Sequence, residues 1–327
     1  MTDPPSPEEL LDAVEQLLLG GAPSYTRVQV AEQVGIPLET AAQLWHSLGF
    51  AHTTDDEVVF TDLDVTALRA TVRLIDAGIL DEESQVAMVR TWGRSFARLA
   101  DWQTELLGSV AAASDDPEAR LAELAVEVIP VVDELQSYIW RRHLLSAAGR
   151  NLLRPSGAGT VRAVGFVDIV GYTTQSKNLD QPDLVALVEH FEEVSTSTTT
   201  DHGGLVVKTI GDEVLYVVDD PTAAARIALE LVERHADDPL FPEVRAGVAL
   251  GSVVSRLGDV FGPTVNIAAR LTSVARPGTV VVDAGMHEAL EAGEDFRLRR
   301  LRRTSVKGYS RLEPWRLKRS HHAADDD

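Results

Sequence analysis

The chain has 327 residues, a formal net charge of −21 and no cysteine. This length suits two domains, and a composition of 44% hydrophobic and 25% charged residues excludes collagen-like, low-complexity and wholly disordered proteins. The lack of cysteine excludes disulfides and thiolate metal sites, so any bound metal is expected to be a hard cation held by carboxylates. No apolar run reaches the length of a membrane span and the N-terminus has no basic signal region, which predicts a cytoplasmic protein.

Residues 1–150 carry most of the negative charge, with 25 Asp and Glu, 10 Arg and no Lys. Apolar residues recur there at spacings of three and four, which predicts an all-α domain. The strongest patterns cover Glu8–Leu19, Leu68–Ile79, Glu83–Leu107 and Pro117–Trp140.

One part of this half has the pattern of a helix-turn-helix. Val28–Val34 and Leu38–Leu48 are separated by Gly35-Ile36-Pro37, in which Gly35 suits a helix end and Pro37 a helix start. A sequence-specific DNA-binding function is therefore one hypothesis. The second helix, however, contains Glu39 and no Lys or Arg, whereas groove docking needs cations that neutralise phosphates, so a structural or regulatory pair is favoured and no nucleic-acid partner is expected.

Periodicity fails at Ser146–Val161, where the composition turns to small residues and includes three glycines and Pro155, which predicts the domain boundary. Beyond it, strands and helices alternate in the order of a ferredoxin-like α/β core. The expected strands and helices are Ala163–Ile169, Pro182–Asp201, the hairpin Leu205–Val218, Thr222–Arg234, Val244–Leu250, Asn266–Ala275 and Thr279–Val282. The predicted fold is α+β: an all-α regulatory domain over 1–143, a linker over 144–160, an α/β catalytic domain over 161–318 and a disordered tail over 319–327.

Two strand ends carry acidic residues that could hold metal and phosphate. Asp168 lies at the end of an apolar strand and is followed by a turn that contains Gly171, and Asp212 lies at the tip of the predicted hairpin. Two carboxylates on neighbouring strand ends can bridge two hard cations, and turn amides beside them can hold a triphosphate. Each motif alone is more often a simple cap or turn.

With two further segments, these motifs resemble the class III nucleotidyl cyclases. Gly258–Leu271, with Asp259, Asn266 and Arg270, resembles the purine-selection and transition-state motif of that family, and the segment around Lys307 resembles its C-terminal phosphate-binding lysine. The resemblance covers about residues 160–318 and follows the order of the family.

The resemblance implies that Asp168 and Asp212 bind two divalent cations, Mg²⁺ or Mn²⁺, which activate the ribose 3′-oxygen of ATP and hold its phosphates. Lys208 and Asp259 would recognise adenine, with Lys208 donating a hydrogen bond to a ring nitrogen and Asp259 accepting one from the exocyclic amine. A guanine-selecting site would instead carry Glu and Cys-like residues at these positions, so ATP is expected over GTP. The remaining roles are ribose orientation by Asn266, charge stabilisation by Arg270, and binding of the phosphates by Lys307 and the turn of Gly171 and Thr173.

Sites of this family lie between two chains, so the resemblance implies a homodimer in which Asp168 and Asp212 come from one chain. The partner chain would contribute Lys208, Asp259, Asn266, Arg270 and Lys307. The segment 251–258 before Asp259 is shorter than the dimerisation arm of many relatives and resembles that of the short-arm bacterial subgroup. The helical first half resembles the autoinhibitory domain of actinobacterial cyclases that respond to acidic pH. His46, His52 and His143 are its candidate pH-sensing residues.

Three rival functions remain for comparison. A diguanylate cyclase would carry Gly-Gly-Asp-Glu-Phe where this chain has Ile210-Gly211-Asp212-Glu213-Val214, and it would lack Asn266 and Arg270. A degenerate nucleotide-binding regulator would be expected to lack one of the seven polar side chains with an implied role. All seven are present: Asp168, Lys208, Asp212, Asp259, Asn266, Arg270 and Lys307. A transcription factor would work through the helix-turn-helix, whose charge opposes that function.

Overall fold

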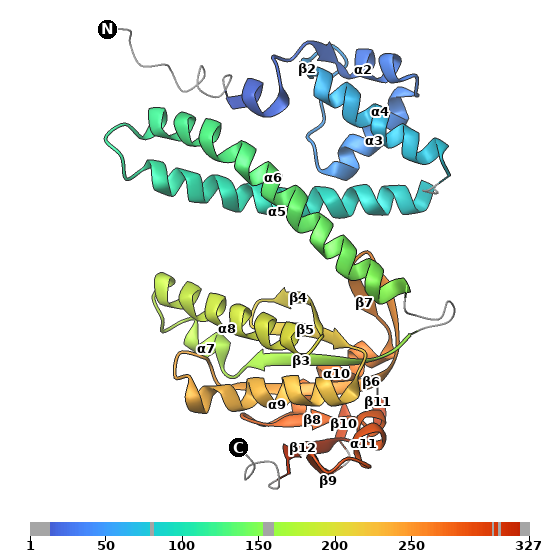
Figure 1. Cartoon of the computed structure of the whole chain (residues 1–327), viewed down its shortest axis with the longest axis vertical. Helices are drawn as coiled ribbons and strands as arrows, with labels where there is room; N and C mark the ends of the chain where they lie inside the picture. The colour runs from blue at the N-terminus through green and yellow to red at the C-terminus, as the bar shows by residue number, and fades with distance from the viewer. Residues whose placement is uncertain (1–13, 79–81, 153–159, 303, 307–308, 321–327) are drawn as a thin grey trace. The chain divides into compact units, whose positions relative to one another are not determined.

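The computed structural model describes residues 14–78, 82–152, 160–302, 304–306 and 309–320, and the chain divides into two compact units, Met1–Pro155 and Ser156–Asp327 (Figure 1). Within the described ranges, every helix is too short or too polar to cross a lipid bilayer.

The first unit is built mainly from helices. The predicted helix-turn-helix is confirmed as α2 (Arg27–Val34) and α3 (Leu38–Leu48), and Gly35 ends α2 with a left-handed φ of 82°. The helices α4 (Asp62–Asp76), α5 (Glu82–Ala111) and α6 (Pro117–Leu152) follow. Residues 14–19 are also helical, and the start of the predicted helix Glu8–Leu19 lies outside the described residues.

The expectation of an all-α first half is incomplete, because β1 (Tyr25–Thr26) and β2 (Val58–Phe60) form a small antiparallel sheet. Both segments contain β-branched or aromatic residues, which suit a pleated surface. Phe60 is buried with its ring centroid 4.5 Å from that of Trp45, so the sheet closes the core of the helix-turn-helix. Helix α6 also continues through Leu152, so much of the predicted linker 144–160 is helical.

The second unit is built on a mixed sheet with the strand order β4-β5-β3-β6-β8-β12-β9. Its first four strands are antiparallel neighbours and, with α8 (Gln181–Asp201) and α9 (Pro221–Asp237), form the predicted ferredoxin-like core. These strands are β3 (Thr160–Ile169), β4 (Leu205–Ile210), β5 (Glu213–Val218) and β6 (Val244–Arg256). The helical reading through Ser195–Thr200 is confirmed by α8.

The two faces of the sheet bury separate cores. Alternate residues of β3 point to opposite sides, as a strand requires, so Val167 packs with α8 and α9 while Val164 and Phe166 pack with α10 (Pro263–Val274). This arrangement places β3 in the centre of the sheet and its Asp168 end beside the β4–β5 turn.

Several elements were not predicted from the sequence. The segment 251–258 continues β6 and turns into β7 (Asp259–Phe261), which pairs with it as an antiparallel hairpin. The other unpredicted elements are α7 (Tyr172–Gln175), α11 (Ala284–Leu290), β9 (Phe296–Arg300), β10 (Thr304–Val306), β11 (Tyr309–Leu312) and β12 (Trp315–Arg319). The strand β8 (Val280–Val282) was predicted. Since β12 lies between β8 and β9, Arg319 of the predicted tail belongs to the sheet; residues 321–327 lie outside the described ranges.

Candidate active site

The two predicted metal-binding carboxylates lie together at one end of the sheet. Asp168 is the second-last residue of β3, and its register partners are Glu213 on β5 and Arg245 on β6. Asp212 occupies the β4–β5 turn, where its carbonyl accepts a hydrogen bond from the amide of Ile169 at 3.0 Å. Gly211 has a φ of 64°, a left-handed conformation that lets the chain reverse directly before Asp212.

Asp168 is paired with a cation that the sequence reasoning did not select. The Nε and Nη2 atoms of Arg245 lie 2.7 and 2.6 Å from Oδ2 of Asp168. Burial raises the pKa of Asp168, the Arg245 guanidinium opposes that rise, and the nearby Asp212 carboxylate adds to it. The ion pair with Arg245 therefore stabilises the charged form of Asp168, whereas the neighbouring Asp212 carboxylate destabilises it.

Glu213 is the third carboxylate of this cluster. Burial, together with the charges of Asp168 and Asp212, raises its pKa to about 7. Its side chain is thus partly protonated at neutral pH, which is the expected response of three crowded carboxyl groups that have one arginine among them.

Lys208 and Asp259 form a second pair, although they lie far apart in the chain. Lys208 is on β4 and Asp259 begins β7, and the Nζ and Oδ2 atoms are 2.5 Å apart. The other carboxylate oxygen of Asp259 accepts a hydrogen bond from the amide of Val260 at 2.8 Å. A partly exposed donor and acceptor are thus held side by side.

Asn266 and Arg270 lie one turn apart on α10, so they share a helix face. Both residues are exposed, and neither side chain forms a hydrogen bond or ion pair with a described residue. The opposite side of α10 is packed into the sheet through the buried Ala268 and Leu271. The sheet therefore fixes the helix while both polar side chains remain available to a ligand.

The predicted phosphate-binding turn lies directly after β3. Gly171 has a φ of 70° and precedes the one-turn helix α7, which includes Thr173. Gln175 Nε2 donates to the carbonyl of Val170 at 2.9 Å and closes the turn. Lys307, the expected phosphate-binding lysine, lies outside the described residues.

The donor chemistry of the first cluster fits hard divalent cations, because Asp168 and Asp212 offer carboxylate oxygens in an acidic, partly buried place. Among the described residues, no group of three or more His, Asp or Glu side chains is arranged to hold a metal. A cation at Asp168 would also have to share that carboxylate with Arg245.

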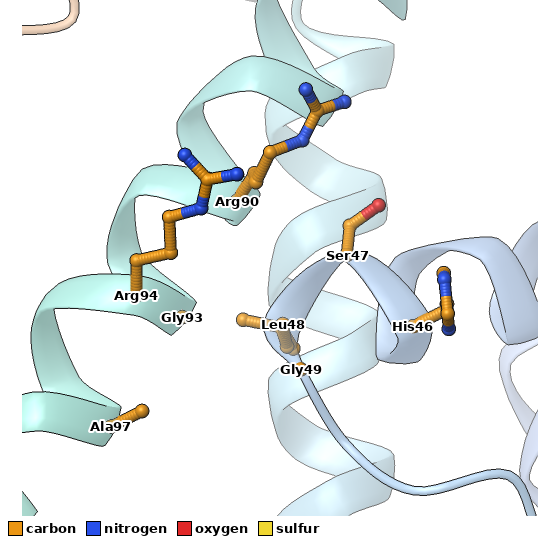
Figure 2. Close-up of a pocket in the computed structure, with 8 residues that line it drawn as sticks. All are labelled: His46, Ser47, Leu48, Gly49, Arg90, Gly93, Arg94 and Ala97. Atoms are coloured by element: carbon orange, nitrogen blue, oxygen red, sulfur yellow. The ribbon is translucent and has the colours of Figure 1, made fainter.

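The three histidines that were predicted to sense pH do not form a cluster. His46 is in the last turn of α3, His52 lies outside any helix or strand, and His143 is in α6; all three are exposed. Figure 2 shows His46 beside a hollow of about 530 Å³ between the end of α3 and α5, with Arg90 and Arg94 on its other side.

Two further members of the charged cluster, Glu213 and Arg245, were not among the residues predicted from the sequence. Arg245 had a visible signal, because it is the only charged residue in the otherwise apolar strand segment Val244–Leu250. Glu213 had none, since only the strand register shows that it faces Asp168 across the β3–β5 pair.

Comparison with known proteins identifies the family to which the chain belongs. The family of adenylate and guanylate cyclase catalytic domains matches residues 158–319. An adenylate cyclase of Glutamicibacter nicotianae is 40% identical over 337 residues, which cover 95% of this chain and 84% of the relative. The chain belongs to the class III adenylate and guanylate cyclases.

Other relatives of this cyclase also match well beyond the catalytic unit. An adenylate cyclase of Streptomyces coelicolor is 36% identical over 348 residues, covering 96% of this chain and 91% of the relative. A pH-sensitive adenylate cyclase of Mycobacterium tuberculosis is 30% identical over 302 residues, with 88% and 75% covered. The likeness therefore extends into the helical first half, where the sequence had indicated a resemblance to regulated actinobacterial cyclases.

Proposed function

We propose that this cyclase converts ATP to 3′,5′-cyclic AMP and pyrophosphate. The observation that carries the proposal is the pair of Lys208 and Asp259, whose charged atoms lie 2.5 Å apart although 51 positions separate them in the chain. Adenine offers a ring-nitrogen acceptor beside an exocyclic amine donor, so a lysine donor beside an aspartate acceptor complements that edge. Guanine reverses this order and would leave the Lys208 and Asp259 side chains mispaired, which costs binding energy.

Asp168 and Asp212 are the residues that would hold two divalent cations, Mg²⁺ or Mn²⁺. Bound cations would neutralise the charge of the triphosphate and would lower the pKa of the ribose 3′-hydroxyl. The carboxylates themselves fix where this positive charge is placed, at the end of the central strand β3.

The other site residues position the substrate. Asn266 would orient the ribose, and Arg270 on the same face of α10 would stabilise negative charge that develops at the α-phosphate. Lys307 and the turn amides around Gly171 and Thr173 would hold the remaining phosphate oxygens. None of these groups needs to exchange a proton, since each acts by hydrogen bonding or charge.

We further propose that the active sites form between two copies of the chain. Asp168 and Asp212 would come from one copy, while Lys208, Asp259, Asn266, Arg270 and Lys307 would come from the other. The exposure of Asn266 and Arg270 in one chain supports this reading, because a transition-state arginine needs a drier environment than a solvent-facing helix provides.

Steady-state assays of the full chain with Mn²⁺ and ATP test the proposed activity, with the product identified chromatographically. The parent should form cyclic AMP, whereas Asp168→Asn and Asp212→Asn should each lose about 100-fold or more in rate, since a lost ligand removes several kcal/mol of charge stabilisation. Glu193→Asn is the matched control, because Glu193 is an exposed residue of α8 outside the site. Near-parental rates in both site variants would refute the assignment of the carboxylates.

The helical first unit is proposed to inhibit the catalytic unit, with relief at acidic pH. The likeness to a pH-sensitive cyclase and the presence of three exposed histidines support this proposal. Imidazoles gain charge between pH 8 and pH 6, when few other groups change. His143 is favoured because it lies in α6, the helix that leads toward the catalytic unit in sequence.

A pH series on the full chain tests this regulation. Cyclic AMP formation should rise as the pH falls from about 8 to about 6, the range in which imidazoles gain charge, and His143→Gln should flatten that rise more than His321→Gln does. Identical profiles for the parent and His143→Gln would exclude His143 as the sensor.

A further inference from the structure

The last two strands of the catalytic sheet concentrate positive charge in an acidic chain. In the order of the sheet, β12 is next to last and β9 is last (Figure 1). Each of the two strands holds three cationic residues and no acidic residue, although the whole chain has a net charge of −21. A local charge opposite to that of the whole molecule attracts anions to that place.

Strand register assigns four of these six side chains to one side of the sheet. Arg316 is directly opposite Arg299, and Lys318 is directly opposite Arg297. Directly opposite residues of antiparallel strands point to the same side. The partner of Arg316 on β8 is Val281, which belongs to the core beneath α10. The four cations therefore lie on the α10 side of the sheet, and we call them the cationic face.

The two remaining cations of these strands lie on the other side and are paired. Nη2 of Arg300 is 2.9 Å from Oε2 of Glu313, and Nε of Arg319 is 2.8 Å from Oε2 of Glu233. By contrast, no side chain of the cationic face forms an ion pair or a hydrogen bond with a residue that the structure describes. The charge is thus balanced on one side of the two strands and unbalanced on the other.

The cationic face is unfavourable in the chain on its own. Like charges placed directly opposite each other on neighbouring strands destabilise a sheet, and both cross-strand pairs of this face are of that kind. Arg316 is partly buried, and its Nε is a buried donor with no acceptor among the described residues. A bound anion would offset the repulsion and supply acceptors, so the face has the character of an incomplete binding site.

The spacing of the four cations suits an anion with more than one phosphate group. Cβ atoms of directly opposite residues are about 5 Å apart, and residues two apart on one strand are separated by about 7 Å. Three of the four side chains are arginines, whose planar guanidinium groups bind phosphate oxygens in pairs. A single phosphate would meet one cross-strand pair, whereas linked phosphates would contact both.

The charge of the rest of the chain favours a small ligand over an extended one. Charge interactions are screened over about 8–10 Å at physiological ionic strength, so a small anion on the cationic face is little repelled by acidic residues elsewhere. A nucleic-acid duplex or an anionic membrane would extend beyond the face and meet the negative charge of the remaining chain.

We infer that the cationic face, formed by Arg297, Arg299, Arg316 and Lys318, binds a free anion that carries two or more linked phosphate groups. This site shares no residue with the proposed active site. It lies in the catalytic unit, on strands that take no part in the proposed reaction.

Calorimetric titration of the full-length protein with inorganic tripolyphosphate, in EDTA and without divalent cations, tests this inference. The parent should bind, and Arg299→Gln should raise the dissociation constant at least about tenfold, because a charge-assisted hydrogen bond is lost. Arg300→Gln is the matched control, since it removes the same charge from the next residue of β9, on the other side of the sheet. Absence of binding by the parent, or equal weakening in both variants, would overturn the inference.

Lys318→Gln provides a second variant of the same face. Arg299 and Lys318 are both exposed, and removal of either charge relieves a like-charge pair, so both variants should fold as the parent does. Lys318→Gln should also raise the dissociation constant for tripolyphosphate. Parental affinity in Lys318→Gln would contradict binding across both cross-strand pairs, as would inorganic phosphate binding as tightly as tripolyphosphate.

Lys307→Gln distinguishes this site from the proposed active site. The binding event that Arg299→Gln weakens should persist in Lys307→Gln. If Lys307→Gln abolished the binding of tripolyphosphate and Arg299→Gln left it unchanged, the anion would occupy the active site and the inference would be wrong. The titration involves no turnover, so its result is independent of the proposed cyclase activity.

Sedimentation with vesicles of phosphatidylcholine and phosphatidylglycerol distinguishes free phosphates from lipid-borne ones. The parent should remain in the supernatant, because the negative charge of the chain opposes an anionic surface. Co-sedimentation of the parent that Arg299→Gln abolishes and Arg300→Gln preserves would show that the face binds a membrane, and it would overturn the assignment to a free anion.

Discussion

At the scale of single residues, the site is defined by crowded charge. Asp168, Asp212 and Glu213 meet at the end of β3, and Arg245 is the cation that pairs with Asp168. In the absence of metal, this cluster costs folding energy, because the partly buried carboxylates repel one another. The raised pKa of Glu213 has the same cause.

The sign of the effect follows from linkage. The pKa of Glu213 rises from an ordinary 4.5 to about 7 in the folded chain, so the folded state binds its proton more tightly than the unfolded state does. Stability is therefore lost as the pH rises from about 4.5 to about 7. Glu213→Gln removes this loss and should stabilise the metal-free protein by about 1 kcal/mol at pH 8, after allowance for solvent screening.

Urea unfolding at pH 5 and pH 8 checks this prediction. The gain from Glu213→Gln should be larger at pH 8, whereas the exposed Glu193→Gln should change little at either pH. An equal gain at both pH values would show that Glu213 is not the group that titrates.

At the scale of elements, periodicity and turn chemistry predicted most of what positions the site. The helix-turn-helix follows from Gly35 and Pro37, and the hairpin that presents Asp212 follows from Gly211 between two apolar runs. The helix through Ser195–Thr200 shows tertiary burial overriding weak propensity, since Ser195, Thr198 and Thr199 are buried.

The missed elements are those whose stability comes from distant partners. β1 and β2 are too short for periodicity to detect, and they exist because Phe60 packs on Trp45. β12 is ordered by pairing with β8 and β9, and the Asp168–Arg245 contact depends on the β3–β6 register. The sequence pattern does not fix this register, because β3 is buried on both faces and so lacks the alternation of apolar and polar residues that specifies a register.

The junction of α3 and α5 gives a prediction at this scale. A Cβ atom on Gly93 would lie 2.3 Å from the carbonyl oxygen of Leu48, which is backbone and cannot rotate away. Gly93→Ala should therefore destabilise the first unit by about 1–3 kcal/mol through overpacking. Gly108→Ala in the same helix meets nothing within 4 Å and should stabilise it by about 0.5–1 kcal/mol, as alanine favours helices.

Thermal or urea unfolding of the two full-length variants measures both effects. Equal stability of Gly93→Ala and Gly108→Ala would show that α5 does not approach α3 as closely as the structure indicates.

At the scale of the whole molecule, the account requires two copies for each active site. Mixing inactive Asp168→Ala with inactive Arg270→Ala should restore about a quarter of the parental rate, because half of the dimers are mixed and each of these holds one intact site. Mixing Asp168→Ala with Asp212→Ala is the control, since both lesions fall in the same residue set and no intact site can form. No restoration in the test mixture, with mixed dimers verified, would place the complete site within one chain. Restoration in the control would show that Asp168 and Asp212 come from different chains.

The most direct measurement is the turnover of Mn²⁺–ATP and Mn²⁺–GTP by the full-length protein, with the cyclic product identified in each case. Because Lys208 and Asp259 match the hydrogen-bonding edge of adenine and oppose that of guanine, kcat/KM should favour ATP by about 100-fold or more. Lys208→Glu should reduce that preference. Equal efficiency with the two nucleotides, or no cyclic nucleotide from either, would contradict the central claim that this chain is an adenylate cyclase.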